Sequence, residues 1–250
     1  MTDPADDARQ PILGVRARDV ADRVLVVGDP DRVAAVATSL EEVVEVGRAR
    51  EYVTVTGRYR GVPVTISSHG VGAGGAAICF EELCRAGART IVRAGTCGGL
   101  QTGVDAGHLV VGTAAVRDDG LTERFITPAW PAVADARLTV ALEERARRED
   151  LTVHTGIVHT AANFYPDALN PEPRWRTFHR AGAVAIEMEY AALLVIAGLH
   201  GVRAGGIFTT DGNLLQADAD MGDYDPGTDT VARAKAAMLT VALDTLVADA

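Results

Sequence analysis

The 250-residue sequence predicts a single α/β domain with a mixed central sheet flanked by helices. Three observations point to this fold class. Short apolar runs typical of buried strands alternate along the chain with segments of helical spacing. No stretch has the composition of a linker, a repeat or a low-complexity tract, and 48% of the residues are apolar, which is enough for a sizeable core. Polar residues gather just after the predicted strands, where open α/β sheets bind their ligands.

In the first half of the chain, each expected element follows from a local pattern. Apolar or alternating runs between turn residues predict strands, and apolar residues three or four positions apart predict helices. In order, we expect a frayed acidic leader at 1–11, a strand at 24–27, a helix at 33–40, strands at 54–59 and 62–68, a glycine-rich bend at 69–75, a helix at 76–86 and a strand at 91–94. Arg60-Gly61 lies between two of these strands, which predicts a β-hairpin.

The second half of the chain continues the alternation. In order, we expect a strand at 107–115, an irregular loop from 118, an amphipathic helix at 138–148, a strand at 152–160, a loop at 163–176, a strand from 183 that runs into a helix ending at 199, a strand at 202–209 and a closing helix at 228–247. The loop at 163–176 carries three of the ten prolines and is expected to line a site.

The stretch from Thr90 to Leu100 predicts an anion-binding site. Its strand delivers Arg93 to a predicted bend that contains Thr96 and three glycines. Arginine offers a fixed fork of donors, threonine adds a hydroxyl, and glycines let backbone N–H groups approach an oxyanion closely. An ordinary strand followed by a glycine turn explains the stretch equally well on its own. Anion-binding residues elsewhere in the chain decide between the two interpretations.

Composition excludes several classes of protein. A net charge of −10 argues against a nucleic-acid binder, and no apolar run reaches membrane-spanning length. Lys235 is the only lysine, so arginine supplies nearly all positive charge; this suits bidentate anion contacts, but a GC-rich genome produces the same bias. The three cysteines form no CxxC pair and the six histidines show no metal-ligand spacing. We therefore expect a cytoplasmic protein with no metal site and no nucleic-acid or membrane partner.

A dinucleotide-binding fingerprint is present but incomplete. The stretch from Gly70 to Gly75 fits G-x-G-x-x-G between a predicted strand and a predicted helix. The acidic residue expected about 20 positions later is absent, and Arg93 stands near that place. An NADP-binding oxidoreductase is therefore a distant alternative. The same bend can instead form a second wall of a monoanion site.

Six short motifs, in order and with similar spacing, resemble the nucleoside phosphorylase family. This family of hexameric bacterial and archaeal enzymes includes purine nucleoside, uridine and methylthioadenosine phosphorylases. The motifs are Gly28-Asp-Pro-Asp-Arg32, Arg50-Glu-Tyr52, Arg93-Ala-Gly-Thr-Cys-Gly-Gly99, Asn163-Phe-Tyr165, Glu187-Met-Glu189 and Thr210-Asp211. The resemblance covers the chain from about Val24 to its last helix. It implies a pentosyltransferase that acts on a nucleoside and inorganic phosphate without another cofactor, as a homohexamer of dimers with shared active sites.

The resemblance also implies a role for individual residues. Those that match the family's ligands are Gly28, Arg32, Arg93 and Thr96 for phosphate, Arg50 for phosphate in the neighbouring subunit's site, Met188 and Glu189 for ribose, and Phe164 for the base. These types suit the chemistry, because phosphate attacks an oxocarbenium-like sugar and arginines hold the dianion beside the developing cation. As alternatives, Arg32 and Arg50 are surface charges and Glu189 forms a structural salt bridge.

The base is the least determined part of the substrate. Asp211 matches the aspartate with which purine-cleaving members protonate the leaving base, and the amide of Asn213 is a candidate contact to a purine edge. Uridine phosphorylases grip uracil with a glutamine and an arginine, where this chain has Ala168 and Asn170. We therefore expect a purine nucleoside phosphorylase of purine salvage, with uridine phosphorylase as the alternative, since the loop 116–135 is closer to the uridine enzymes.

Two further positions depart from the family pattern. The histidine that members lend across the dimer to the sugar 5′-hydroxyl is replaced by Ile12, an apolar residue that suits a 5′-methylthio group. Methylthioadenosine is therefore a further candidate substrate. The arginine that assists the catalytic aspartate in many purine members has no match, because Arg233 is out of register.

Overall fold

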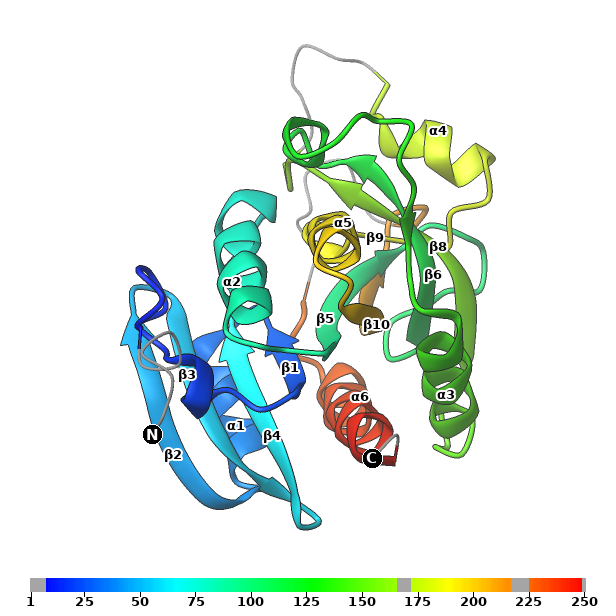
Figure 1. Ribbon diagram of the computed structural model, residues 1–250. Helices are drawn as coiled ribbons and strands as arrows, with labels where there is room; N and C mark the ends of the chain where they lie inside the picture. Colours follow the sequence, from blue (N-terminus) through cyan, green and yellow to red (C-terminus); the bar gives the residue numbers. More distant parts are fainter. Residues whose placement is uncertain (1–7, 166–171, 217–224, 249–250) are drawn as a thin grey trace.

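The mixed sheet expected from the sequence is the centre of the structure (Figure 1). The computed structural model describes residues 8–165, 172–216 and 225–248. Within these residues, the strands of the ten-stranded sheet are β1 (Arg23–Val27), β2 (Glu41–Ala49), β3 (Tyr52–Tyr59), β4 (Val62–Ser68), β5 (Thr90–Gly99), β6 (Leu109–Asp118), β7 (Ala132–Val133), β8 (Val153–Ala161), β9 (Ala185–Glu187) and β10 (Arg203–Asn213). Parallel and antiparallel pairs both occur, so the predicted α/β fold class with a mixed sheet is confirmed.

The strand order has an open part and a closed part. β2, β3, β4 and β1 follow one another to β5. β5, β9, β8, β6 and β10 are also neighbours in that order, and β10 pairs again with β5, so these five strands close into a ring. β1, β4, β5 and β10 run parallel. Their carboxyl ends therefore meet at one edge of the sheet.

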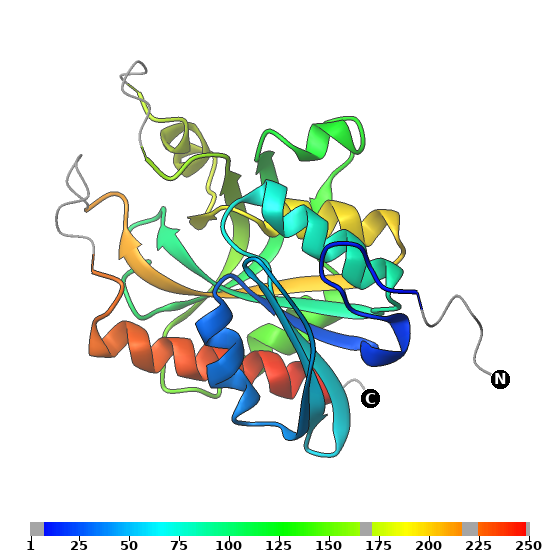
Figure 2. The same cartoon turned by 90° about the vertical axis from the view of Figure 1, so that its left-hand side faces the viewer.

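Helices cover both faces of this sheet. They are α1 (Pro30–Ala37), α2 (Ala73–Arg85), α3 (Ala136–Ala146), α4 (Trp175–Arg180), α5 (Tyr190–Leu199) and α6 (Asp229–Ala248), with short 3₁₀ turns at Ala17–Asp19 and Thr122–Arg124. One buried cluster contains α2 and α5, and a second contains α1, α3 and α6. Figure 2 shows α2 and α5 on one side of the sheet and α1 and α6 on the other.

Local sequence explains where several helices begin and how closely they pack. Asp29 caps α1 by accepting a hydrogen bond from the backbone N–H of Asp31, and Pro30 occupies the first turn, where a missing N–H costs nothing. α5 is apolar on every side and almost entirely buried, as expected of a central helix. The Tyr190 ring at its start fits only because Gly112 and Gly206 lack side chains; a Cβ on either glycine would lie 2.4 or 2.6 Å from the ring.

The prediction of a glycine-rich bend after Arg93 is wrong, because β5 continues to Gly99. Gly98 and Gly99 pair with β9, and the same stretch of β5 pairs with β10. A Cβ on Gly99 would lie 2.1 Å from the carbonyl oxygen of Val104, and one on Gly98 would lie 2.3 Å from Leu214 Cδ1. The glycines serve close packing between strands rather than a turn.

Other boundaries also differ from the prediction. β2 was not expected, because its adjacent Val43 and Val44 break the alternation that identifies a strand, and it is largely exposed. α2 begins at Ala73 rather than 76, since Gly72 turns the chain at a φ of 88°. β10 continues past 209 to Asn213. Residues 8–11, assigned to a frayed leader, are partly tied down by a bridge between Arg9 and Arg16.

Candidate active site

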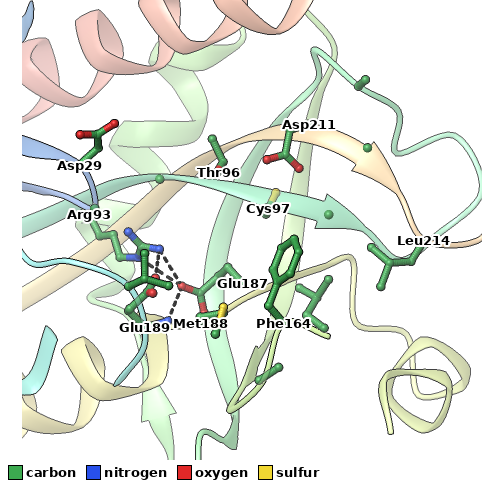
Figure 3. A pocket seen from close by; sticks show the side chains of 18 of the residues that line it. Asp29, Arg93, Thr96, Cys97, Phe164, Glu187, Met188, Glu189, Asp211 and Leu214 are labelled. Atoms are coloured by element: carbon green, nitrogen blue, oxygen red, sulfur yellow. Dashed lines mark hydrogen bonds and ion pairs between the residues drawn. The ribbon is translucent and has the colours of Figure 1, made fainter. Parts of the chain in front are cut away.

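A cavity of about 900 Å³ lies at the edge of the sheet where β1, β4, β5 and β10 end. Nine of the ten residues predicted for the site line it, and Arg50 does not. The nine are Gly28, Arg32, Arg93, Thr96, Phe164, Met188, Glu189, Asp211 and Asn213. Figure 3 shows Thr96 and Asp211 on neighbouring strands, with Arg93 pointing toward Glu187 and Glu189. Segments as far apart in the chain as Gly28 and Asn213 therefore converge on one cavity.

Arg93 is the buried cation of this cavity. Its side chain is 4% exposed, and its Nη2 pairs with Oε2 of Glu189 and lies 3.1 Å from Oε2 of Glu187. Its Nε donates to Glu187 Oε2 at 3.2 Å, and its Nη1 lies 2.9 Å from Nε2 of His69. Two carboxylates and an imidazole thus fix the orientation of the guanidinium group.

Glu187 organises the turn between β9 and α5. Its Oε2 accepts hydrogen bonds from the backbone N–H groups of Glu189 at 2.8 Å and Tyr190 at 2.9 Å, so it caps α5 while also holding Arg93. Its Oε1 accepts from the hydroxyl of Thr160 at 2.7 Å, and that hydroxyl accepts from the Ala191 N–H at 2.9 Å. The side chain of Glu187 is fully buried, so this network is shielded from water.

Glu189 stands between two elements of the cavity wall. Its Oε1 accepts from the backbone N–H of Gly72 at 2.5 Å, and its Oε2 contacts Arg93. Burial raises the pKa of this carboxyl group, while the charge of Arg93 opposes the rise and that of Glu187 adds to it. The predicted glycine-rich bend at 69–75 therefore does contribute a wall to the site, through Gly70, Val71 and the N–H of Gly72.

Two arginines share the part of the cavity next to β1. Burial lowers the pKa of Arg32, and the nearby charge of Arg93 lowers it further, against Asp29 and Asp211, which raise it. Arg32 nevertheless stays charged, because arginine is not deprotonated in proteins. Two guanidinium groups in a partly buried place offer several charged N–H donors to an anion, beside the carboxylates of Glu187 and Glu189 that hold Arg93.

Lys235 on α6 extends this cluster of positive charge. Its ammonium group donates to the carbonyl oxygen of Pro226 at 2.9 Å. Burial and the charge of Arg32 lower its pKa, whereas Asp211 and Asp29 raise it, so it lies in the field of the same groups. The only lysine of the chain therefore borders the predicted anion site.

The part of the cavity around Phe164 is apolar. Phe164, Ile186 and Leu214 line it, and Phe164 is half-exposed and packs edge-to-face on Tyr165 with ring centroids 5.3 Å apart. Asp211 lies at a break in the register of β10 between Thr210 and Gly212. Ala168 and Asn170, on which the argument against uracil depends, lie outside the described residues.

The amide of Asn213 faces the protein rather than the cavity. Its nitrogen donates to the carbonyl oxygens of Gln101 and Val104, both at 2.9 Å, and its oxygen accepts from the Leu215 N–H at 2.8 Å. These bonds use both amide hydrogens. Asn213 therefore stabilises the 101–104 loop. Neither of its N–H groups is left to make the expected contact to the edge of a purine.

Two residues predicted to act across a dimer lie away from this cavity. Arg50 is exposed at the turn between β2 and β3, where it adopts a left-handed φ of 55°. Ile12 is half-buried, and its N–H donates to the carboxylate of Glu82 at 3.0 Å. Their expected contribution to a neighbouring subunit's site stays a prediction.

The sequence did not predict a role for three residues in or beside the cavity: His69, Glu187 and Lys235. Glu187 stands inside a recognised motif, but only the fold shows that its carboxylate supports Arg93 and Glu189. Among the described residues, no group of three potential ligands could hold a metal ion, and Cys79, Cys84 and Cys97 are free and buried. In the same part of the chain, none of the helices has the length and apolar character needed to cross a membrane.

Comparisons with known proteins identify the family of this chain. The Phosphorylase superfamily matches residues 22–248. Relatives include a purine nucleoside phosphorylase of Plasmodium falciparum, 37% identical over 85% of this chain and 86% of the relative, and a uridine phosphorylase of Thermococcus kodakarensis, 36% identical over 80% and 76%. The crystal structure of a Toxoplasma gondii purine nucleoside phosphorylase with immucillin-H superposes with a TM-score of 0.90 at 32% identity, over 99% of this chain and 98% of that one. The chain therefore belongs to the nucleoside phosphorylases of the phosphorylase superfamily and is a pentosyltransferase.

Proposed function

We propose that the chain is a phosphate-dependent purine nucleoside phosphorylase. The observation that carries the proposal is the meeting, in one cavity, of two arginines, the carboxylate of Glu189 and the carboxyl group of Asp211. Arginines suit a phosphate dianion, a carboxylate suits the vicinal hydroxyls of a ribose, and a second carboxyl group suits proton transfer to a leaving base.

In the proposed reaction, a phosphate oxygen forms a bond to C1′ of the sugar as the bond from C1′ to the base nitrogen breaks. Arg32, Arg93 and Thr96 hold the phosphate against the face of the sugar, and Glu189 accepts hydrogen bonds from the 2′- and 3′-hydroxyls. The negative charge of Glu189 and of the phosphate stabilises the positive charge that develops on the sugar ring. Met188 packs against the sugar and Phe164 against the base.

The base leaves with the electrons of the broken bond. Asp211 supplies a proton to N7 of the purine and remains as a carboxylate, so the products are the free purine and (deoxy)ribose 1-phosphate. Inorganic phosphate is a co-substrate, and the proposed reaction requires no further cofactor. A nucleosidase that uses water needs no paired arginines beside the sugar, which favours phosphorolysis.

Uridine phosphorolysis is the second candidate function, because relatives of this chain with similar identity are named uridine phosphorylases. Asp211 supports the purine reaction, since a uracil leaving group has no N7 to protonate. Among purines, the apolar Ile12 favours 5′-deoxy-5′-methylthioadenosine if the N-terminal segment reaches a neighbouring subunit's site.

A substrate panel tests these assignments. Initial rates are measured with inosine, guanosine, adenosine, methylthioadenosine and uridine, each with and without phosphate. We expect phosphate-dependent release of a purine base. Faster cleavage of uridine than of every purine nucleoside would overturn the base assignment, and equal rates without phosphate would overturn phosphorolysis.

We further propose that the enzyme is a cytoplasmic homohexamer of dimers and that Arg50 completes the phosphate site of the adjoining subunit. Arg50 is exposed at a hairpin tip and does not line its own cavity, as a residue that acts across an interface would. Arg50→Ala should be inactive, and mixing it with Asp211→Asn subunits should restore activity in the sites that combine one intact residue of each kind. Failure of every mixture would contradict the shared site.

A further inference from the structure

His69 connects two elements of the proposed phosphate site without lining the cavity. Its ring is completely buried at the end of β4 and packs edge-on against Phe80. Its backbone N–H donates to Val27 at 2.9 Å, and Gly70 next to it donates to Gly28 at 3.0 Å, so this segment extends the pairing with β1 up to the predicted phosphate loop. Its Nε2 lies 2.9 Å from Nη1 of Arg93.

These contacts fix the state of the imidazole. A guanidinium group can only donate hydrogen bonds, so Nε2 of His69 must be the acceptor and carry no proton. Nδ1 lies 2.8 Å from the carbonyl oxygen of Gly70, which can only accept, so Nδ1 carries the proton. The ring is therefore neutral and in a single tautomer. Burial lowers its pKa well below the usual range, and the charge of Arg93 lowers it further.

A neutral partner suits the charges around Arg93. Glu187 and Glu189 already bring two carboxylates to one guanidinium group. A third carboxylate at the place of His69 would repel an incoming phosphate dianion, and an apolar residue would leave a buried N–H without an acceptor. An imidazole nitrogen satisfies the donor and leaves the charge of the arginine undiminished.

From these contacts we infer that His69 is a positioning residue for phosphate: it holds Nη1 of Arg93 in the orientation that phosphate binding requires. Glu187 and Glu189 hold the opposite side of the guanidinium group, and His69 holds the side nearest Gly28. The inference rests on the proposed function, because it takes Arg93 as a phosphate ligand. Loss of the His69 contact should therefore weaken phosphate binding more than nucleoside binding.

Two substitutions separate the two hydrogen bonds of the ring. His69→Gln places an amide oxygen where Nε2 stood and keeps an acceptor for Arg93. His69→Asn keeps a donor for Gly70 near the place of Nδ1 but is too short to reach Arg93. His159→Asn is the matched control, since His159 is also buried but does not line the cavity and does not contact Arg93.

The experiment measures KM for phosphate, KM for the nucleoside and the melting temperature of each full-length protein. The wild-type protein is assayed first, because a missing or phosphate-independent activity would overturn the proposed function itself. Given that activity, His69→Asn should raise the phosphate KM about tenfold or more and leave the nucleoside KM within about threefold. His69→Gln should recover most of the phosphate affinity.

The outcomes that overturn the inference are distinct. Equal phosphate KM values for His69→Asn, His159→Asn and wild type would show that Arg93 needs no support from His69. Equal increases in both KM values, with a melting temperature lowered as much as in His159→Asn, would show a general structural role. If His69→Asn does not fold, the test uses His69→Gln instead. A phosphate KM for His69→Gln that is raised as far as that of Arg93→Lys would contradict the role of His69 as the acceptor for Arg93.

Discussion

The wall of the cavity around Arg93 and the wall around Phe164 are built in different ways. The first is a buried network in which one guanidinium group is held by two carboxylates and an imidazole, and the carboxylates are themselves held by backbone N–H groups. The second consists of the apolar side chains of Phe164, Ile186 and Leu214, and Phe164 is half-exposed. In the proposed reaction, the phosphate and sugar, which all substrates share, face the network. In the same proposal, the base, which differs between substrates, faces the wall with few directional contacts.

Removal of Glu187 tests the network most severely. Glu187→Ala leaves the N–H groups of Glu189 and Tyr190, the Thr160 hydroxyl and Nε of Arg93 without their acceptor in a buried place. We expect a loss of about 3 kcal/mol or more in the free energy of unfolding, measured by urea denaturation, and a loss of nearly all activity. Glu187→Gln keeps one oxygen and should lose less. A variant as stable and active as wild type would show that the network is dispensable.

Asp211→Asn tests the proposed general acid. The amide has the shape of the acid but cannot give up a proton, so kcat for a purine nucleoside should fall about a hundredfold or more with little change in stability. Asp225→Asn is the control, because Asp225 lines the same cavity outside β10. Unchanged purine phosphorolysis in Asp211→Asn would refute the role of Asp211 as the acid.

Phe164→Ala tests whether the apolar wall binds the base. Loss of an aromatic stacking surface should raise the nucleoside KM about tenfold while the phosphate KM stays constant. Phe125→Ala serves as the control, since Phe125 is also partly exposed but does not line the cavity. A rise in the phosphate KM instead would mean that the two walls are not independent.

The smallest expected effect is the dependence of stability on pH. Burial, as the first cause, lowers the pKa of His69 in the folded protein, whereas an unfolded histidine titrates near about 6.5. Below that pH the unfolded chain takes up a proton that the folded protein does not. The contribution of His69 to the free energy of unfolding is therefore fully present above about pH 6.5 and declines as the pH falls. For His69 the decline is about 1 kcal/mol between pH values of about 6.5 and 5.5.

The measurement is urea denaturation at several pH values. His154 and His159, whose pKa values burial also lowers, act in the same direction. His69→Asn should therefore flatten the profile between about pH 5 and 6.5 without removing its slope entirely. Parallel profiles for wild type and variant would contradict a neutral buried His69.

The sequence predicted the residues of the cavity better than its geometry. Arg93, Thr96 and Glu189 stand in motifs that can be read locally. The course of β5 could not be read, because local glycines indicate a turn while pairing with β9 and β10 imposes a strand. Arg93 is held by His69, 24 positions away in the chain, and by Glu187, 94 positions away, and no rule of sequence spacing predicts such contacts. The edge strand β2 lacks the alternation on which strand prediction depends.

The solitary Lys235 has a practical consequence for anyone who attaches a probe to this enzyme. Lysine is the side chain that common acylating dyes and affinity resins target, and here it occurs once, on α6 beside the cavity. Burial and the charge of Arg32 lower its pKa, so more of the amine is unprotonated than at an ordinary lysine. A succinimidyl ester can therefore acylate one side-chain amine, at the border of the cavity, besides the α-amino group of the chain. Immobilisation through lysine would attach the enzyme beside its own cavity.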